Sequence, residues 1–292
     1  ATLFTLNKLL VNPAYRQRVV SSLDDNALKD FWQSEFNRAG NFQKVKMSGG
    51  VTAKISRFQR SAVTRRILEQ PKSTINFDDI IQSGKILICN FAKGAIGEDT
   101  SSLLGISVLA KLQLAATRRS KMARATRSPF YLYVDEFQNF ATESFVQMLS
   151  EARKFKLFLT MAEQTTAQQD QALVDNILAN AGTVVCFRSA AQADARLVAP
   201  VFEPYLTSGD IANLPAFNFF VRIAATVAQT PMSGITIPIK DKGSEQTARA
   251  VIRSSRNRYT TPYVKQMGAA DDQRTYRGYA RTPTAVYKVP QH

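Results

Sequence analysis

Two adjacent carboxylates follow an apolar run in the sequence. The run from Phe130 to Val134 leads directly into Asp135 and Glu136 within SPFYLYVDEFQNF. In an open α/β sheet, ligands bind beyond the carboxyl ends of the strands, where these acids are expected. An Asp there can hold Mg²⁺, usually through water, and a neighbouring Glu can deprotonate a water that attacks a γ-phosphate. A strand that exits into a charged loop gives the same pattern, so the pair alone leaves both interpretations open.

A glutamine and several basic residues extend this pattern. Gln164 ends the next apolar run, KLFLTMAEQ, where its amide can sense a γ-phosphate or position the attacking water. Between the two runs a helical pattern ends in Arg153 and Lys154, which offset the helix dipole. An arginine there can also reach a nucleotide in a neighbouring subunit, and such a group raises hydrolysis rates about 10³–10⁵-fold. Arg188, which ends TVVCFR, is a weaker candidate for a similar place.

The elements that must position these residues alternate along the chain. Apolar runs predict strands at 85–91, 130–134, 156–162, 183–187 and 219–224, and helical patterns lie near 98–118, 142–154, 168–180 and 190–203. Continuous apolar strands separated by helices indicate an α/β fold with a mostly parallel sheet covered on both faces. The alternation of Ile235, Ile237 and Ile239 predicts a closing antiparallel hairpin with the preceding strand.

Two flanking regions differ from this pattern. Residues 1–83 are predicted to be mainly helical, with Asn12 and Pro13 as a cap and first-turn pair. A helix over about 51–69 carries five bases, which form either a phosphate-facing stripe or a solvated face: Lys54, Arg57, Arg60, Arg65 and Arg66. Residues 240–292 hold eleven Lys or Arg against four acids, which predicts a short helix and a disordered basic tail.

Composition narrows the function classes. The 292 residues contain 38 Lys and Arg against 23 Asp and Glu, and the net charge of +15 implies a polyanionic partner. Cys89 and Cys186 lie in apolar runs and are expected to be small buried hydrophobes, without a disulfide framework or zinc spacing. The single histidine, His292, is the last residue, which excludes histidine-based catalysis. The sequence lacks a signal-peptide pattern, and its most hydrophobic helix is too short and polar to span a bilayer with ease.

The motifs taken together resemble a known family. DEFQNF, SEARK, MAEQTTAQ, AGTVVCFR and the Asp194–Ala195 pair are similar to the C-terminal half of the motor domain of type IV secretion coupling proteins. These conjugative DNA pumps are HerA/FtsK-type ATPases, and the resemblance covers roughly residues 5–240. It implies a RecA-like fold, ATP and Mg²⁺ as cofactors, and a hexameric ring around DNA. By resemblance, Asp135 and Glu136 form the Walker B pair, Gln164 is the sensor and Arg153 is the arginine finger.

One family motif is missing. The phosphate-binding loop GxxxxGK[ST] does not occur, and Gly84–Lys85 lacks the surrounding residues. Lys93–Gly94 and Gly97 follow a predicted strand, but their spacing favours a structural turn. We therefore expect the chain to be a fragment of a longer protein. In such folds we expect the loop-bearing strand between the DE strand and the Gln strand, so their edges would be unpaired and the fragment unstable or inactive.

The resulting interpretation divides the chain into a helical region (1–83), the C-terminal part of a RecA-like core (84–240) and a basic tail (241–292). The expected function is an ATP-hydrolysing DNA translocase, a coupling protein that moves DNA or DNA–relaxase cargo to a secretion channel. Its expected partners are DNA, other subunits, the relaxase and channel proteins. The expected location is the cytoplasmic face of the inner membrane, with membrane contact only through segments outside this chain. The alternatives are a soluble HerA-like DNA-processing ATPase and a non-catalytic DNA-binding or docking module.

Overall fold

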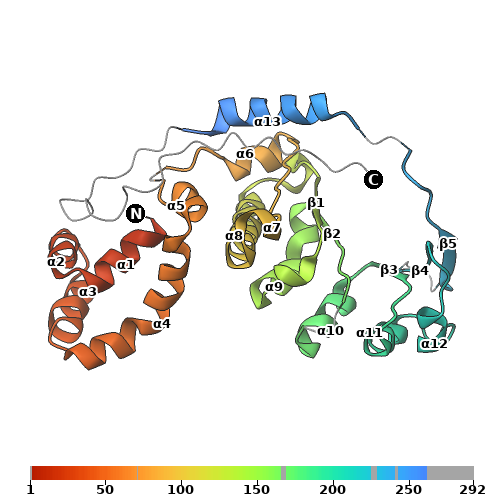
Figure 1. Ribbon diagram of the computed structural model, residues 1–292, viewed down its shortest axis with the longest axis horizontal. Coiled ribbons are helices and arrows are strands. Elements are labelled where there is room, and N and C mark those ends of the chain that lie inside the picture. The colour runs from red at the N-terminus through yellow and green to blue at the C-terminus, as the bar shows by residue number, and fades with distance from the viewer. Residues whose placement is uncertain (1, 71, 166–168, 225–228, 241–242, 262–292) are drawn as a thin grey trace.

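The N-terminal residues form a helical region at one end of the molecule (Figure 1). The computed structural model describes residues 2–70, 72–165, 169–224, 229–240 and 243–261. The N-terminal elements are α1 (Leu3–Val11), α2 (Pro13–Ser21), α3 (Asn26–Asp30), the π-helical η1 (Phe31–Phe36), α4 (Asn41–Arg60) and α5 (Ala62–Leu68). Asn12 caps α2 as predicted, since its Oδ1 accepts a hydrogen bond from the Tyr15 amide at 2.9 Å. The helix predicted over 51–69 starts earlier, at Asn41, and is interrupted at Ser61.

The central part holds a parallel pair of strands. Its elements are α6 (Phe77–Gln82), α7 (Lys93–Ile96), α8 (Glu98–Arg118), η2 (Arg119–Lys121), η3 (Arg124–Thr126), β1 (Phe130–Val134), η4 (Phe137–Asn139), α9 (Glu143–Ala152), η5 (Arg153–Phe155), β2 (Leu157–Met161) and α10 (Gln171–Asn180). β1 and β2 are parallel neighbours, in register from Phe130 opposite Leu157 to Val134 opposite Met161. The prediction that a third strand lies between them is wrong, because their backbones pair directly.

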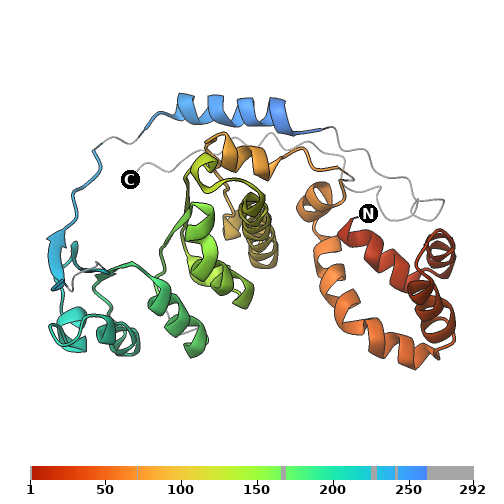
Figure 2. The same cartoon turned by 180° about the vertical axis from the view of Figure 1, so that it is seen from behind.

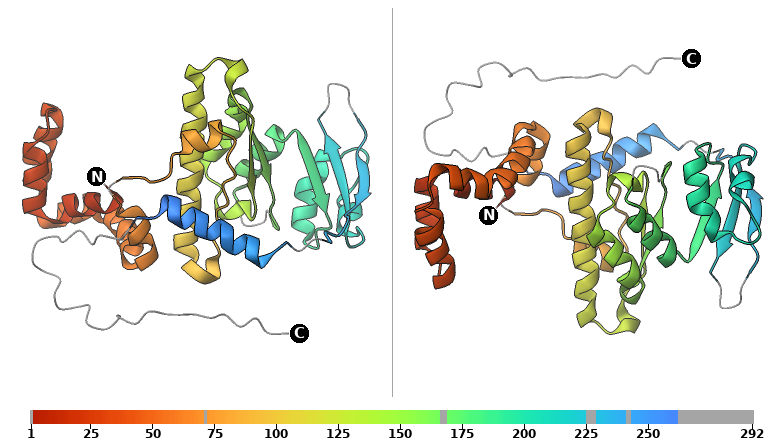
Figure 3. Two further views of the ribbon diagram at one scale, coloured as in Figure 1. Left: turned by 90° about the horizontal axis from the view of Figure 1, so that it is seen from above. Right: turned by 90° about the horizontal axis from the view of Figure 1, so that it is seen from below.

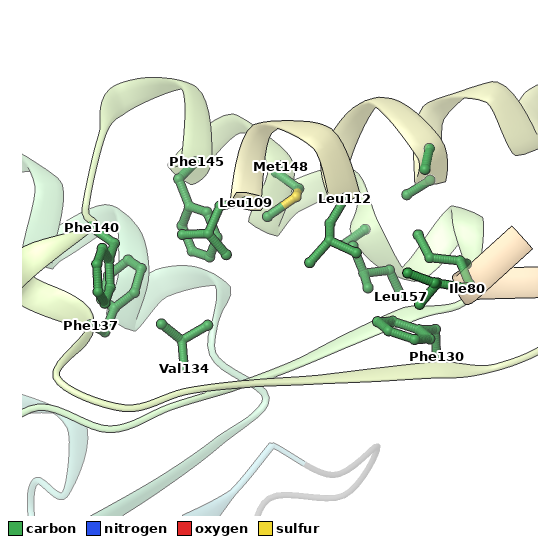
Figure 4. Packing of buried hydrophobic residues seen from close by; sticks show 14 of the residues in the cluster. Ile80, Leu109, Leu112, Phe130, Val134, Phe137, Phe140, Phe145, Met148 and Leu157 are labelled. Carbon is green, nitrogen blue, oxygen red and sulfur yellow. The ribbon is translucent and has the colours of Figure 1, made fainter. Parts of the chain in front are cut away.

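The main core lies on one face of this strand pair. Figure 4 shows α8 and α9 above the strands, with Leu112, Met148 and Phe130 packed between them. The opposite face carries Tyr131 and Tyr133, which are 61% and 72% exposed. The sheet was predicted to be covered on both faces, but within the described residues helices cover only one.

A second sheet lies at the end of the molecule away from α1–α4 (Figure 3). It contains β3 (Thr183–Phe187), β4 (Asn218–Ile223) and β5 (Met232–Ile235), together with α11 (Gln192–Val198), η6 (Ala199–Val201) and α12 (Ser208–Ala212). Both strand pairings are antiparallel, which confirms the closing hairpin but departs from the mostly parallel prediction. The reason is that α11 and α12 return the chain to the end of β3, so that Phe219 lies opposite Phe187. Their core is a small cluster around Phe202 and Ile211.

The strand predicted at 85–91 does not form. This segment runs beside β1 without strand pairing, and a groove of about 890 Å³ lies between them and α8. Ile86 and Ile88 point to solvent, while Leu87 and Phe91 pack on the main core. Cys89 is exposed and Cys186 is intermediate, so the prediction that both are buried is wrong. The alternation of apolar residues correctly predicted that one side of this segment packs on the core. It could not show that the backbone lacks a neighbouring strand to pair with.

A buried arginine fixes the amino ends of the two strands. Arg119 is 3% exposed and donates hydrogen bonds to the carbonyl oxygens of Ser128 at 2.8 Å and Phe155 at 2.9 Å. A third bond, also 2.9 Å, goes to the carbonyl of Ile81 at the end of α6. Burial lowers the pKa of Arg119, and the neighbouring Arg127 lowers it further. One side chain thus ties together α6 and the segments that lead into β1 and β2.

The last described helix is α13 (Glu245–Tyr259), which crosses above α6 in Figures 1 and 2. It confirms the short helix predicted after residue 240, whereas the predicted tail beyond it lies outside the described residues. All of its residues except Tyr259 are exposed. The carbonyl oxygen of Tyr259 accepts a hydrogen bond from Thr74 Oγ1 at 2.6 Å. None of the helices that the structure describes is both long and apolar enough to cross a membrane.

Candidate functional site

The carboxyl ends of β1 and β2 bring two predicted site residues together. The parallel register continues past the strands, because the Ala162 amide bonds to the Val134 carbonyl and the Phe137 amide to the Ala162 carbonyl, both at 2.9 Å. The residues that follow the two strands therefore share one edge. Gln164 Nε2 donates a hydrogen bond to Glu136 Oε1 in a close contact. The juxtaposition predicted from the sequence is present in the structure.

Glu136 adopts a backbone conformation that is uncommon for a residue with a side chain. Its φ of 50° and ψ of 46° lie in the left-handed region, where non-glycine residues are disfavoured. The following Phe137 is 1% exposed, and its burial in the main core holds this turn in place. Conformational strain of this kind, of order 1–3 kcal/mol, clusters at functional sites. The turn aims the carboxylate across the strand end toward Gln164.

Both carboxylate oxygens of Glu136 accept hydrogen bonds from amides. Gln164 holds Oε1, and Gln138 Nε2 donates to Oε2 at 2.6 Å. These donors, with the Glu136 amide that bonds to Asp135 Oδ1 at 3.0 Å, offset the repulsion between the adjacent acids. Gln138 was not among the predicted site residues. Its Oε1 is buried and has no hydrogen-bond partner among the described residues, so this amide is only half satisfied.

Asp135 is the acid that fits a metal. It is exposed, one oxygen accepts the Glu136 amide, and its other oxygen has no hydrogen-bond partner in the described part of the chain. No cluster of three or more His, Cys, Asp or Glu that could hold a metal occurs among the described residues. A single carboxylate still suits Mg²⁺, which keeps several waters and takes its remaining ligands from substrate phosphates. Both oxygens of Glu136 already accept an amide hydrogen bond, so Asp135 is the less engaged of the two acids.

A lysine interpreted as part of a turn lies beside this site. Lys93 Nζ donates to Asn139 Oδ1 at 2.6 Å, and it also lies 3.2 Å from Glu98 Oε1. Asn139 in turn donates from Nδ2 to the Glu136 carbonyl at 3.0 Å. Lys93 is therefore linked to Glu136 through the side chain of Asn139. The sequence places Lys93 about 40 residues upstream of the acids, so only the fold reveals this proximity.

The residues after Gln164 connect the site to α11. Thr165 Oγ1 donates to Asp194 Oδ2 at 3.0 Å, and Asp194 is only 6% exposed. Partial burial raises the pKa of Glu163 although part of its side chain reaches solvent, and the charge of Asp194 raises it further. A hydrogen bond from Gln169 Nε2 at 2.5 Å acts in the opposite direction. Acidic groups thus concentrate at this edge of the sheet.

The two candidate arginines do not contact the acids. Arg153 is exposed in η5, before β2, so it lies at the opposite end of that strand from Gln164. The five residues of β2 separate the two ends by about 16 Å. Arg188 is exposed just after β3. Among the described hydrogen bonds and ion pairs, neither guanidinium reaches Asp135, Glu136 or Gln164.

Fold and site together define a RecA-like α/β architecture with an acid pair and a polar amide at the carboxyl edge. Residues 129–202 match the family described as "TraM recognition site of TraD and TraG". This segment contains the acid pair, Gln164 and Arg153. No curated protein sequence matches the chain at a significant level.

Solved structures support the same architecture. The chain is similar to the unbound bacterial conjugative coupling protein TrwB with a TM-score of 0.55 and 12% identity, covering 82% of this chain and 58% of that one. TrwB in complex with ADP and Mg²⁺ gives a TM-score of 0.52, 12% identity, and coverages of 84% and 65%. The genome packaging NTPase B204 from Sulfolobus turreted icosahedral virus 2 is less similar, with a TM-score of 0.40 at 16% identity over 56% of this chain and 73% of that one, and it adds no support. The chain therefore spans about three fifths of the TrwB structures. The resemblance to the C-terminal part of a coupling-protein motor domain is confirmed.

Proposed function

We propose that this chain is part of the ATP-hydrolysing motor of a type IV secretion coupling protein, which moves DNA or DNA–relaxase cargo toward a secretion channel. The observation that carries the proposal is the contact between Glu136 and Gln164 at the carboxyl edge of a parallel strand pair. The match over residues 129–202 and the TrwB-like fold support it. We also propose the three-part division into residues 1–83, 84–240 and 241–292.

The proposed chemistry assigns one task to each side chain. Asp135 would hold Mg²⁺, which would neutralise phosphate charge. Glu136 accepts a proton from the attacking water. Gln164 and Gln138 each donate one hydrogen bond to its carboxylate, and each oxygen keeps a further acceptor site for the water. A γ-phosphate would compete with Glu136 for the Gln164 amide, so nucleotide binding would make Oε1 more accessible to the water.

The arginines require a neighbouring subunit. Since Arg153 lies at the other end of β2 from the acids, it can act as a finger only on the site of an adjacent protomer. This placement supports a ring of subunits, which we propose is a hexamer. Arg188 remains the weaker candidate for a similar role. Together they would offset the charge that develops on the transferred phosphoryl group.

The phosphate-binding loop must come from residues outside this chain. We propose that its strand pairs with the edges of β2 and β3, because each of these strands has a partner on only one side within the described sheets. Such a strand would join the two sheets into one. The expected location is the cytoplasmic face of the inner membrane, with relaxase and channel proteins as partners.

The decisive test is the variant Glu136→Gln in the full-length protein. We expect DNA-stimulated ATP turnover to fall by about 10²–10⁴-fold, the typical contribution of a general base, while ATP binding is retained. The control is Glu151→Gln, which removes an exposed acid whose one partner among the described ion pairs is Lys154. Unchanged turnover in Glu136→Gln would refute the catalytic assignment and favour the non-catalytic DNA-binding or docking module.

The basic C-terminal segment gives a separate test of the DNA partner. Residues 241–292 include α13, with Arg249, Arg253, Arg256 and Arg258, all exposed. Deleting the segment should flatten the dependence of log affinity for DNA on log salt, because each lost phosphate contact lowers the slope by about 0.9. Fluorescence anisotropy with a labelled duplex measures this slope, and an unchanged slope would exclude the segment as a DNA contact. The HerA-like alternative separates from the coupling protein by whether the full-length protein carries membrane-spanning helices.

A further inference from the structure

The segment formed by α4, Ser61 and α5 concentrates positive charge. Residues 41–68 contain no Asp or Glu and seven bases, which are Lys44, Lys46, Lys54, Arg57, Arg60, Arg65 and Arg66. This short segment therefore contributes +7 to a chain whose net charge is +15. Charge of one sign without interspersed acids attracts polyanions over distances of about a Debye length.

Four of these bases form one open face of α4. One side of the helix packs against the rest of the N-terminal region through Ser48 and Ile55, which are buried. Lys46, Lys54, Arg57 and Arg60 are all exposed, and at 3.6 residues per turn they fall within about a third of the helix circumference. We call these four residues the α4 basic face.

The α4 basic face is almost free of ion pairs. The described ion pairs include one member of the face: Arg57 Nε lies 4.0 Å from Asp99 Oδ2, and both side chains are largely exposed. An exposed pair at this distance stabilises little, so the guanidinium remains available to another anion. The other three members take part in none of the described ion pairs.

Small residues lie between the charges. Gly49, Gly50 and Ala53 occupy the middle of the helix, and a Cβ added at either glycine would meet nothing within 4 Å. These small residues leave room for the backbone of a ligand to approach the helix closely. Phe42, Met47 and Val51 of α4 are also exposed and lie in line with the face or beside it, so an anionic partner is inferred from the charges alone.

We propose that the α4 basic face binds the phosphate backbone of duplex DNA without reading its sequence. The 20 residues of α4 are about 30 Å long, close to one turn of the duplex at roughly 34 Å. Lysine and arginine contacts to phosphates supply sequence-independent affinity. This inference rests on the DNA partner of the proposed function, but it assigns contact to a helix outside the nucleotide site.

The test compares two charge-matched variants of the full-length protein. The first replaces Lys46, Lys54, Arg57 and Arg60 by Gln. The second replaces four exposed bases elsewhere by Gln, namely Arg18, Arg38, Lys111 and Arg124. Affinity for a labelled duplex of arbitrary sequence is measured between about 50 and 200 mM salt. Circular dichroism melting shows whether each variant folds.

We expect the face variant to lower the salt slope by about 3–4, since each lost phosphate contact removes about 0.9. The control should change it by less than 1. Equal changes in both variants would overturn the inference, because net charge alone would then explain the binding. An unchanged affinity in the face variant would also overturn it and leave an acidic protein as the occupant. If the unmodified protein binds no DNA, the proposed function fails as well, whereas DNA binding with an unaffected face variant refutes this inference alone.

Discussion

The two ends of the β1–β2 pair differ in charge and in how their polar groups are satisfied. The carboxyl end gathers acids and amides around a strained residue, Glu136. The amino end gathers bases, including Arg119, Arg127 and Arg153. Arg119 is buried and bonded to three backbone carbonyls, which cannot move away. Glu136 is bonded to two side-chain amides, which can exchange their partner for a ligand.

The amino end of the strand pair stabilises the fold, whereas the carboxyl end carries the groups suited to chemistry. Buried charges need fixed partners, because an unpaired one is costly. A reacting group needs partners that can be displaced, together with access to solvent. The amino end satisfies the first condition and the carboxyl end satisfies the second. The two ends therefore predict mutational effects of different kinds.

Replacing Arg153 is expected to have the largest effect on ATP turnover. We expect Arg153→Ala in the full-length protein to lower DNA-stimulated ATP turnover by about 10³-fold or more, as loss of an arginine finger does. Because the residue lies at the wrong end of β2 for its own site, mixing Arg153→Ala with Glu136→Gln subunits should restore part of the turnover. Steady-state hydrolysis of the single variants and of the mixture measures this.

Two outcomes would exclude Arg153 as an arginine finger. Turnover that stays at the level of the unmodified protein would make it a base that only stabilises the end of α9. A mixture that is no more active than the variants alone would exclude action on a neighbouring site.

Replacing Arg119 tests the amino end. Arg119→Met leaves three carbonyl oxygens without their donor, and each unsatisfied buried group costs about 1–3 kcal/mol. We expect the free energy of unfolding to fall by about 3 kcal/mol or more, as measured by urea denaturation. Arg124→Met, at an exposed position in η3, should change it by less than about 0.5 kcal/mol. Equal effects of the two variants would show that Arg119 does not fix the strand ends.

The smallest expected effect concerns Glu163 at the carboxyl end. Its pKa is raised by partial burial and by Asp194, so its ionised form is disfavoured in the folded chain. The resulting cost is present at neutral pH and disappears as the pH falls and the carboxyl becomes protonated in both states. Glu163→Gln should therefore raise the melting temperature slightly at pH 7 and not at about pH 3. A lower melting temperature at pH 7 would show that the charge of Glu163 stabilises the fold.

The sequence predicted the local features of the site well. Apolar runs identified β1 and β2, and their parallel arrangement placed Glu136 and Gln164 at one edge. The cap at Asn12 and the α13 helix were also evident from residue type and spacing. These features depend on local conformational preference and on the period of apolar residues, which are encoded in short windows.

The features that were wrong depend on partners distant in sequence. Nothing in the runs at 183–187 and 219–224 distinguishes parallel from antiparallel pairing, and the segment at 85–91 has a strand pattern without a paired neighbour. The strand order around Gln164 and the exposure of Cys89 also depend on which strands pair, and strand pairing joins residues far apart in the sequence. Lys93 was interpreted as part of a structural turn, because only the fold brings it to Asn139. Asn139 was detectable, since Asn side chains often hydrogen-bond the backbone of a turn.

Whether Glu136 and Gln164 serve one ATP-hydrolysing pocket can be measured with a double-mutant cycle. The cycle follows DNA-stimulated ATP turnover in the full-length protein with Glu136→Gln, Gln164→Ala and both together. We expect each single variant to lose most of the turnover and the double variant to lose no more than Glu136→Gln alone, because the effects of residues that act as a unit are not additive. Independent, multiplicative losses, or turnover near that of the unmodified protein in Glu136→Gln, would contradict it.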